Sequence, residues 1–112
     1  MKVLIIDDDK LFGSMLKFQI SDLTNNEADV LYISDTNHVK LNLEGHDMIL
    51  IDNNLENCSY SSGQVISFFE EVGMGDKIII ISGTIPSEDL SKPFLIKSEN
   101  LAKVLVSQYF KK

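Results

Sequence analysis

The feature that most constrains the fold of this chain is a series of short, almost continuous apolar runs. Four of them stand at residues 3–6, 30–33, 48–51 and 77–81, and each is about as long as one β-strand. A run without polar alternation is typical of a strand that is buried on both faces, as in a parallel sheet. The sequence therefore predicts at least four strands of such a sheet.

Helical patterns separate and follow these runs. Apolar residues recur at helical spacing in segments near 10–23, 36–43, 65–72 and 98–110. Strands that alternate with helices predict an α/β fold, in which a parallel sheet is doubly wound and covered on both faces. The 112 residues contain no repeat, low-complexity tract or linker, so we expect one domain over residues 1–112.

Composition narrows the classes of function. A formal net charge of −7 argues against a nucleic-acid surface, which needs clustered basic residues. The single cysteine, Cys58, excludes an internal disulfide and a multi-cysteine zinc site, and it suits a reducing compartment. The apolar run at residues 3–6 is too short for a signal peptide, so we expect none, and no segment has the roughly 18 apolar residues that would cross a membrane. We therefore expect a cytoplasmic protein.

Polar residues follow three of the predicted strands at the point where each strand ends. Asp7 and Asp8 follow the first run, Asp52 follows the third, and Ser82 follows the fourth. Ligand sites of open α/β sheets lie beyond the carboxyl ends of the strands. The sequence therefore predicts one crevice that is lined by three carboxylates and a hydroxyl.

Three carboxylates in one crevice repel one another unless a proton or a cation neutralises them. Mg²⁺ suits such a site, because it accepts carboxylate, water and phosphate oxygens. A carboxylate there can also act as a nucleophile towards phosphorus. Lys92 and Ser82 are the candidates for a cation and a hydroxyl that contact a phosphoryl group.

Four motifs, in this order along the chain, resemble the response-regulator receiver family. They are residues 3–9 (VLIIDDD), 46–52 (HDMILID), 78–83 (IIIISG) and 90–94 (LSKPF). The resemblance covers nearly the whole chain and implies a five-stranded, flavodoxin-like (CheY-like) parallel sheet. It also implies a phospho-acceptor of a two-component or phosphorelay system, a conformational switch without turnover on a separate substrate. The phosphodonor would be a histidine kinase or a histidine phosphotransfer protein.

The resemblance assigns the metal and phosphoryl-acceptor roles. Asp7 and Asp8 would hold Mg²⁺, and Asp52 would be both a metal ligand and the phosphorylated residue. The backbone carbonyl of Asn54, two residues later, would be a further metal ligand. Activity as a switch would therefore depend on Mg²⁺.

The resemblance also assigns the residues around the phosphoryl group. Ser82 would turn its hydroxyl toward this group, Lys92 would contact it, and Gly83 would leave room for the phosphodonor. The peptide bond between Lys92 and Pro93 would be cis and would hold the lysine over the pocket.

One stretch departs from the family pattern. Nine residues, 83–91, separate Ser82 from Lys92, and they are too few for a helix and a strand together. We therefore expect four main helices, a loop or single turn at 83–88, a remnant of the fifth strand at 89–91, and Asp89 at the family's aromatic switch position. The missing helix would expose apolar surface near Ile85, Leu90 and Phe94, through which the protein would bind a partner or a second copy.

Two other functions remain open from the sequence. A pseudo-receiver would have the same fold and act as a protein-binding module without phosphorylation. A phosphatase of the haloacid-dehalogenase type would use Asp7 and Asp9 as its nucleophile motif, followed by Ser82 and Lys92. It also needs an acidic pair after the lysine, and Glu99 is the one acid that follows Lys92.

Overall fold

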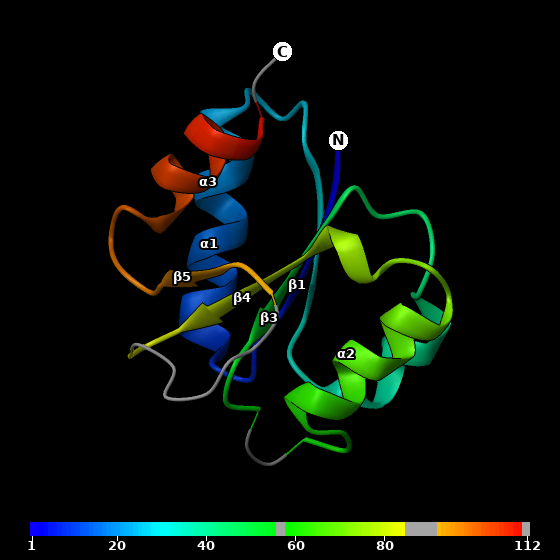
Figure 1. Cartoon of the computed structure of the whole chain (residues 1–112). Coiled ribbons are helices and arrows are strands. Elements are labelled where there is room, and N and C mark those ends of the chain that lie inside the picture. Colours follow the sequence, from blue (N-terminus) through cyan, green and yellow to red (C-terminus); the bar gives the residue numbers. More distant parts are fainter. Residues whose placement is uncertain (56–57, 85–91, 111–112) are drawn as a thin grey trace.

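A computed structural model describes residues 1–55, 58–84 and 92–110. Its parallel sheet has the order β2-β1-β3-β4-β5, which confirms the predicted five-stranded, doubly wound, CheY-like architecture (Figure 1). The strands are β1 (Lys2–Ile6), β2 (Asp29–Ile33), β3 (Met48–Asp52), β4 (Ile78–Ser82) and β5 (Phe94–Ile96).

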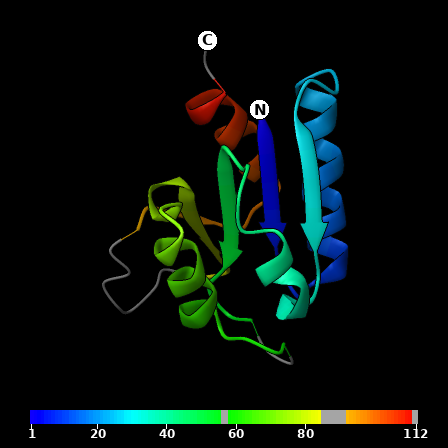
Figure 2. The ribbon, with the colours of Figure 1, turned by 90° about the vertical axis from the view of Figure 1, so that its right-hand side faces the viewer.

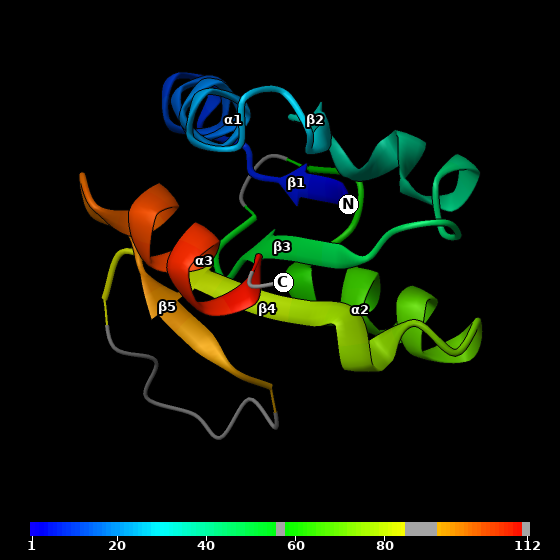
Figure 3. The same ribbon diagram turned by 90° about the horizontal axis from the view of Figure 1, so that it is seen from above.

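Helices lie on both faces of the sheet. On one face are α1 (Lys10–Leu23) and α3 (Leu101–Tyr109); on the other are α2 (Ser62–Glu71) and the 3-10 helix η1 (Thr36–Leu41), as Figure 3 shows from above. A second 3-10 helix, η2 (Gly75–Lys77), leads into β4. None of the helices in the described ranges combines the length and hydropathy needed to cross a bilayer.

The strands carry core residues on both faces, as their apolar runs predict. In β1, Val3 and Ile5 pack with the α1 and α3 side of the core, whereas Leu4 and Ile6 pack with the α2 side. All four side chains are at most 1% exposed. Each contributes about 1.5–3 kcal/mol by burial, so the central strands form a rigid support for the residues at their ends.

The segment near 36–43 differs from the prediction. It forms the six-residue 3-10 helix η1, so three α-helices stand in the described part of the chain where four main helices were expected. Within it Thr36 and Val39 are buried, while Leu41 is 82% exposed. Two inward positions and several poor helix formers do not stabilise a longer α-helix. Figure 2 shows the face of the sheet that α2 and η1 cover.

The fifth strand also lies later in the sequence than predicted. It is Phe94–Ile96, and it pairs with β4 through Ile80 opposite Phe94 and Ser82 opposite Ile96. The expected strand remnant at 89–91 and most of the expected turn at 83–88 lie outside the described residues, as do Ile85 and Leu90. The predicted cis bond before Pro93 is wrong, because the described chain has no cis peptide bond.

Candidate functional site

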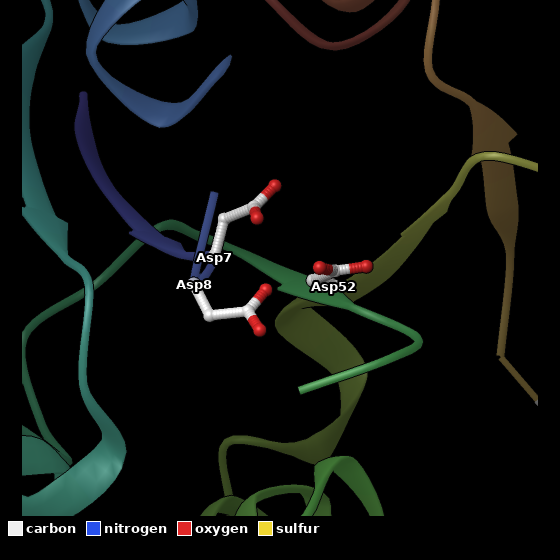
Figure 4. A group of neighbouring side chains, drawn as sticks. All are labelled: Asp7, Asp8 and Asp52. Atoms are coloured by element: carbon white, nitrogen blue, oxygen red, sulfur yellow. The ribbon is translucent and has the colours of Figure 1, made fainter. Parts of the chain in front are cut away.

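Three carboxylates meet at the carboxyl ends of β1 and β3. Asp7 and Asp8 follow β1, and Asp52 is the last residue of β3. Figure 4 shows the three side chains directed toward the same space, and one oxygen from each lies within 4.8 Å of the others. The structure thus brings together the three acids that the strand ends predicted.

Backbone contacts fix two of these carboxylates. The Asp9 amide donates a hydrogen bond to Asp7 Oδ1 at 2.9 Å, and the Asn54 amide donates to Asp52 Oδ1 at 3.2 Å. The Ser62 hydroxyl donates to the Asp52 carbonyl at 2.6 Å and ties the end of β3 to the first residue of α2. The site is therefore held by tight turns at strand ends and not by flexible side chains alone.

The cation at this site is Lys97, which directly follows β5. Its Nζ lies 2.8 Å from Asp7 Oδ2 and 3.2 Å from Asp52 Oδ2. The same nitrogen lies 4.8 Å from the centre of the Phe12 ring, in cation–π geometry. Two carboxylates and one aromatic face therefore determine where the ammonium group sits.

The prediction that Lys92 occupies this position is wrong. Lys92 Nζ donates to the Gly75 carbonyl at 3.0 Å and lies 3.6 Å from Glu70 Oε2, beside α2 and η2. The reason is the later start of β5. Lys92 precedes the strand and so lies towards its amino end, whereas Lys97 follows the strand and reaches the carboxyl edge.

The electrostatics of the site reflect its burial and its charges. Burial, followed by the charge of Asp7, raises the pKa of Asp52 to about 7, although the Asn54 amide and Lys97 oppose the rise. Burial tends to lower the pKa of Lys97, but Asp7 and Asp52 outweigh it, and the net pKa is raised. The lysine is therefore charged at neutral pH, while Asp52 stands near half ionisation without a further cation.

The remaining predicted residues lie at the same edge. Gly83, Asn54 and Lys97 line a hollow of about 300 Å³ together with the acidic residues Asp8, Asp9 and Asp52. Ser82 is buried beside it, and its hydroxyl donates to the Thr84 carbonyl at 2.6 Å. The Ser82 hydroxyl is thus engaged by its own loop and not by the Asp52 carboxylate.

The donor set suits a hard divalent cation. With all three carboxylates ionised and one ammonium beside them, two negative charges remain within a few ångströms, and the oxygens are ligands of the kind Mg²⁺ accepts. Asp9 has another task, because its Oδ1 accepts from the Phe12 amide and caps α1. This use of Asp9 argues against the paired nucleophile motif of the phosphatase alternative.

Sequence reasoning missed Lys97 and the aromatic side chains around the acids. The signal for Lys97 was present, because residues 94–96 are a short apolar run that ends at a polar residue, like the other four. Phe12 and Tyr32 carry no such signal. The Tyr32 hydroxyl donates to the Asp7 carbonyl at 2.7 Å. Burial, together with the charges of the nearby acids, raises its pKa to about 12.

Comparison with known proteins supports the fold at the level of structure. No family model matches the sequence, and no curated protein matches it. The structure resembles the receiver domain of a DNA-binding response regulator from Colwellia psychrerythraea, with a TM-score of 0.78, 17% identity and coverage of 100% of this chain and 99% of that one. It also resembles the chemotaxis protein CheY4 of Vibrio cholerae, with a TM-score of 0.75, 16% identity and coverage of 95% and 92%.

A third similar structure is the response regulator TrrA of Thermotoga maritima, solved in complex with Mg²⁺ and BeF. Its TM-score is 0.73 at 17% identity, with coverage of 95% of this chain and 94% of that one. Identities this low establish the fold alone. The chain therefore has the CheY-like fold of response-regulator receiver domains over nearly its whole length.

Proposed function

We propose that this protein is a phospho-acceptor receiver that is phosphorylated on Asp52 in a reaction that depends on Mg²⁺. The observation that carries the proposal is the meeting of Asp7, Asp8 and Asp52 within 4.8 Å, with the Lys97 ammonium against two of them. Three carboxylates beside a single ammonium cost stability unless a further cation or a proton offsets their repulsion, and the cluster faces an open hollow of about 300 Å³ that could admit one.

Asp7, Asp8 and Asp52 would hold the metal ion, with the Asn54 carbonyl as a further ligand. When bound, Mg²⁺ supplies positive charge that offsets the repulsion between the carboxylates and an incoming phosphoryl group. It also lowers the pKa of Asp52, because a nearby cation favours the ionised form. The nucleophilic carboxylate is then available at neutral pH.

In the proposed reaction, a carboxylate oxygen of Asp52 attacks the phosphorus of a phosphohistidine or of acetyl phosphate. An O–P bond to Asp52 forms as the P–N bond, or the P–O bond to acetate, breaks, and the leaving group departs with the bonding electrons. Lys97 takes the role that the sequence assigned to Lys92, and its ammonium contacts a phosphoryl oxygen. Asp52 is modified and no separate substrate is turned over.

The switch would run through Ser82. Its hydroxyl donates to the Thr84 carbonyl at 2.6 Å and accepts from the Thr84 amide at 3.3 Å. A phosphoryl group on Asp52 offers a stronger acceptor, because hydrogen bonds to charged oxygens are about twice as strong as neutral ones. Transfer of this hydrogen bond would release Thr84.

The proposed phosphodonor is a histidine kinase or a histidine phosphotransfer protein. The helix that begins beside the acids, α1, exposes Leu11 and Phe18 at 83% and 71%. Apolar side chains this exposed offer a docking surface on the helix that follows the turn of Asp7 and Asp8. A second surface lies on β5, where Phe94 and Ile96 are 41% and 38% exposed, and it is our candidate for a homodimer contact.

We propose no contact with nucleic acid or membrane, and a cytoplasmic location.

Labelling with acetyl phosphate tests the proposal. The wild type should incorporate phosphate only when Mg²⁺ is present, and Asp52→Asn should incorporate none. Asp29→Asn, at the start of β2 and the opposite edge of the sheet, is the matched control and should label like the wild type. If the wild type binds Mg²⁺ but is labelled by neither acetyl phosphate nor phosphohistidine donors, the protein is a pseudo-receiver and the proposal fails.

A further inference from the structure

Tyr32 joins β2 to the acidic turn that follows β1. Its hydroxyl donates to the Asp7 carbonyl at 2.7 Å and lies 3.3 Å from the Asp9 carbonyl. Tyr32 pairs with Ile5 in the sheet, so its ring extends past the end of β1 to reach the turn. A side chain from a neighbouring strand thus contacts both ends of the segment that carries Asp7 and Asp8.

Gly13 provides the space for this ring. A Cβ atom at Gly13 would lie 2.2 Å from Tyr32 Cε1 and 2.4 Å from Tyr32 Cζ, distances that carbon atoms do not adopt. Glycine inside a helix costs about 1 kcal/mol relative to alanine. Its presence in the second turn of α1 is explained by the close contact between the helix backbone and the Tyr32 ring.

Hydrogen bonds hold the turn of residues 7–9 through both its amide and its carbonyl groups. On the amide side, Asp9 N–H donates to Asp7 Oδ1, and Asp9 Oδ1 accepts from the Phe12 amide. On the carbonyl side, the Tyr32 hydroxyl donates a hydrogen bond to the Asp7 carbonyl. These contacts fix the peptide planes from which the carboxylates of Asp7 and Asp8 extend.

This restraint opposes a force that the site creates. One oxygen from each of Asp7, Asp8 and Asp52 lies within 4.8 Å of the others, and like charges at this separation repel. A free turn would relax by moving Asp7 and Asp8 away from β3, and binding a cation would then require the turn to be ordered again. Pre-ordered ligands avoid this cost and bind more tightly.

We propose that Tyr32 is a positioning residue for the divalent-cation site, and that its hydroxyl holds the turn of Asp7 and Asp8 in the arrangement that binds Mg²⁺. The inference rests on the proposed function, since it concerns the same ion. It adds a residue outside the ligand set, together with the glycine that accommodates it.

Tyr32→Phe is the direct test, because it removes the hydroxyl and leaves the ring against Gly13. We expect the Mg²⁺ dissociation constant, measured by calorimetric titration, to rise by about tenfold, the lower end for loss of a partner that orients a metal ligand. The Mg²⁺ concentration that gives half-maximal labelling should rise by the same factor, while the rate at saturating Mg²⁺ stays near that of the wild type.

Thr24→Val is the matched control. The Thr24 hydroxyl donates to the Ile20 carbonyl at 2.8 Å, at the far end of α1, so this variant loses a similar hydrogen bond away from the acids. It should lower the midpoint of unfolding and leave Mg²⁺ affinity unchanged. Wild-type Mg²⁺ affinity in Tyr32→Phe, with only the unfolding midpoint lowered, would overturn the inference. A wild-type protein that binds no Mg²⁺ would instead overturn the proposed function on which it rests.

Discussion

Replacing Asp52 with asparagine should stabilise the metal-free protein, and the gain should grow with pH. The folded protein holds the Asp52 proton up to a pKa of about 7, whereas the ordinary value is 3.8. Between these two values the folded state binds more protons than the unfolded state, so the free energy of unfolding falls as pH rises. Below the ordinary pKa both states are protonated, and this contribution vanishes.

The magnitude follows from the same two values. The pKa of Asp52 differs by about three between the folded state and its ordinary value. Above pH 7 this difference lowers the free energy of unfolding by about 4 kcal/mol. Asp52→Asn also removes one of the two carboxylates beside Lys97, a loss that depends little on pH because Asp7 keeps its contact at 2.8 Å. The cleaner quantity is therefore the change with pH, which we expect to be about 2 kcal/mol between about pH 5.5 and pH 8.

Urea unfolding followed by circular dichroism, with a chelator and constant ionic strength, measures this difference. Asp22→Asn, on the exposed side of α1, changes the net charge equally and reports the effect of charge alone. Saturating Mg²⁺ should reduce the advantage of Asp52→Asn, because the ion binds the intact cluster and stabilises the wild type. A stability gap between wild type and Asp52→Asn that stays constant, or shrinks, toward high pH would refute the assignment of a strained, proton-holding Asp52.

The two lysines should differ sharply on mutation. Lys97→Met should lower acetyl-phosphate labelling by about 10²-fold, since a preorganised charge near the reacting group is lost. Lys92→Met should be labelled at the wild-type rate and should unfold at a lower urea concentration. Equal labelling of both variants would contradict the placement of Lys97. Leu11→Glu and Phe18→Glu should leave acetyl-phosphate labelling intact and slow transfer from a phosphohistidine protein by about tenfold or more. Equal loss with both donors would show that α1 affects the site itself and is not a docking surface.

The sequence was sufficient for four of the five strands and for the three acids at their ends. Continuous apolar runs predicted buried strands, and Asp7, Asp8 and Asp52 stand where such runs end, so their convergence follows from parallel topology. Chain order and hydrophobic pattern fix these features locally, which makes them predictable.

The predicted lysine is wrong because a two-residue motif constrains the fold less than the pattern of apolar strands does. The pair Lys92-Pro93 matches the family motif and so predicts the strand at 89–91, whereas the apolar run that pairs with β4 is Phe94–Ile96. The contact between Tyr32 and Gly13 was beyond local patterns altogether. It joins a strand to a helix that precedes it in the chain, and only the packing of α1 against the sheet creates it.

The placement of Lys97 after β5 has a consequence for local stability. β5 has three residues, lies at the edge of the sheet and is paired with β4 alone, whereas β1 and β3 are internal strands. Short edge strands open at a lower free-energy cost than a buried core, so amide exchange should be faster in β5 than in β1 or β3. Each opening would withdraw the ammonium from Asp7 and Asp52 while both carboxylates stay in place. We therefore expect the lysine and the carboxylates of this site to stand on parts of the sheet that open at different free-energy costs.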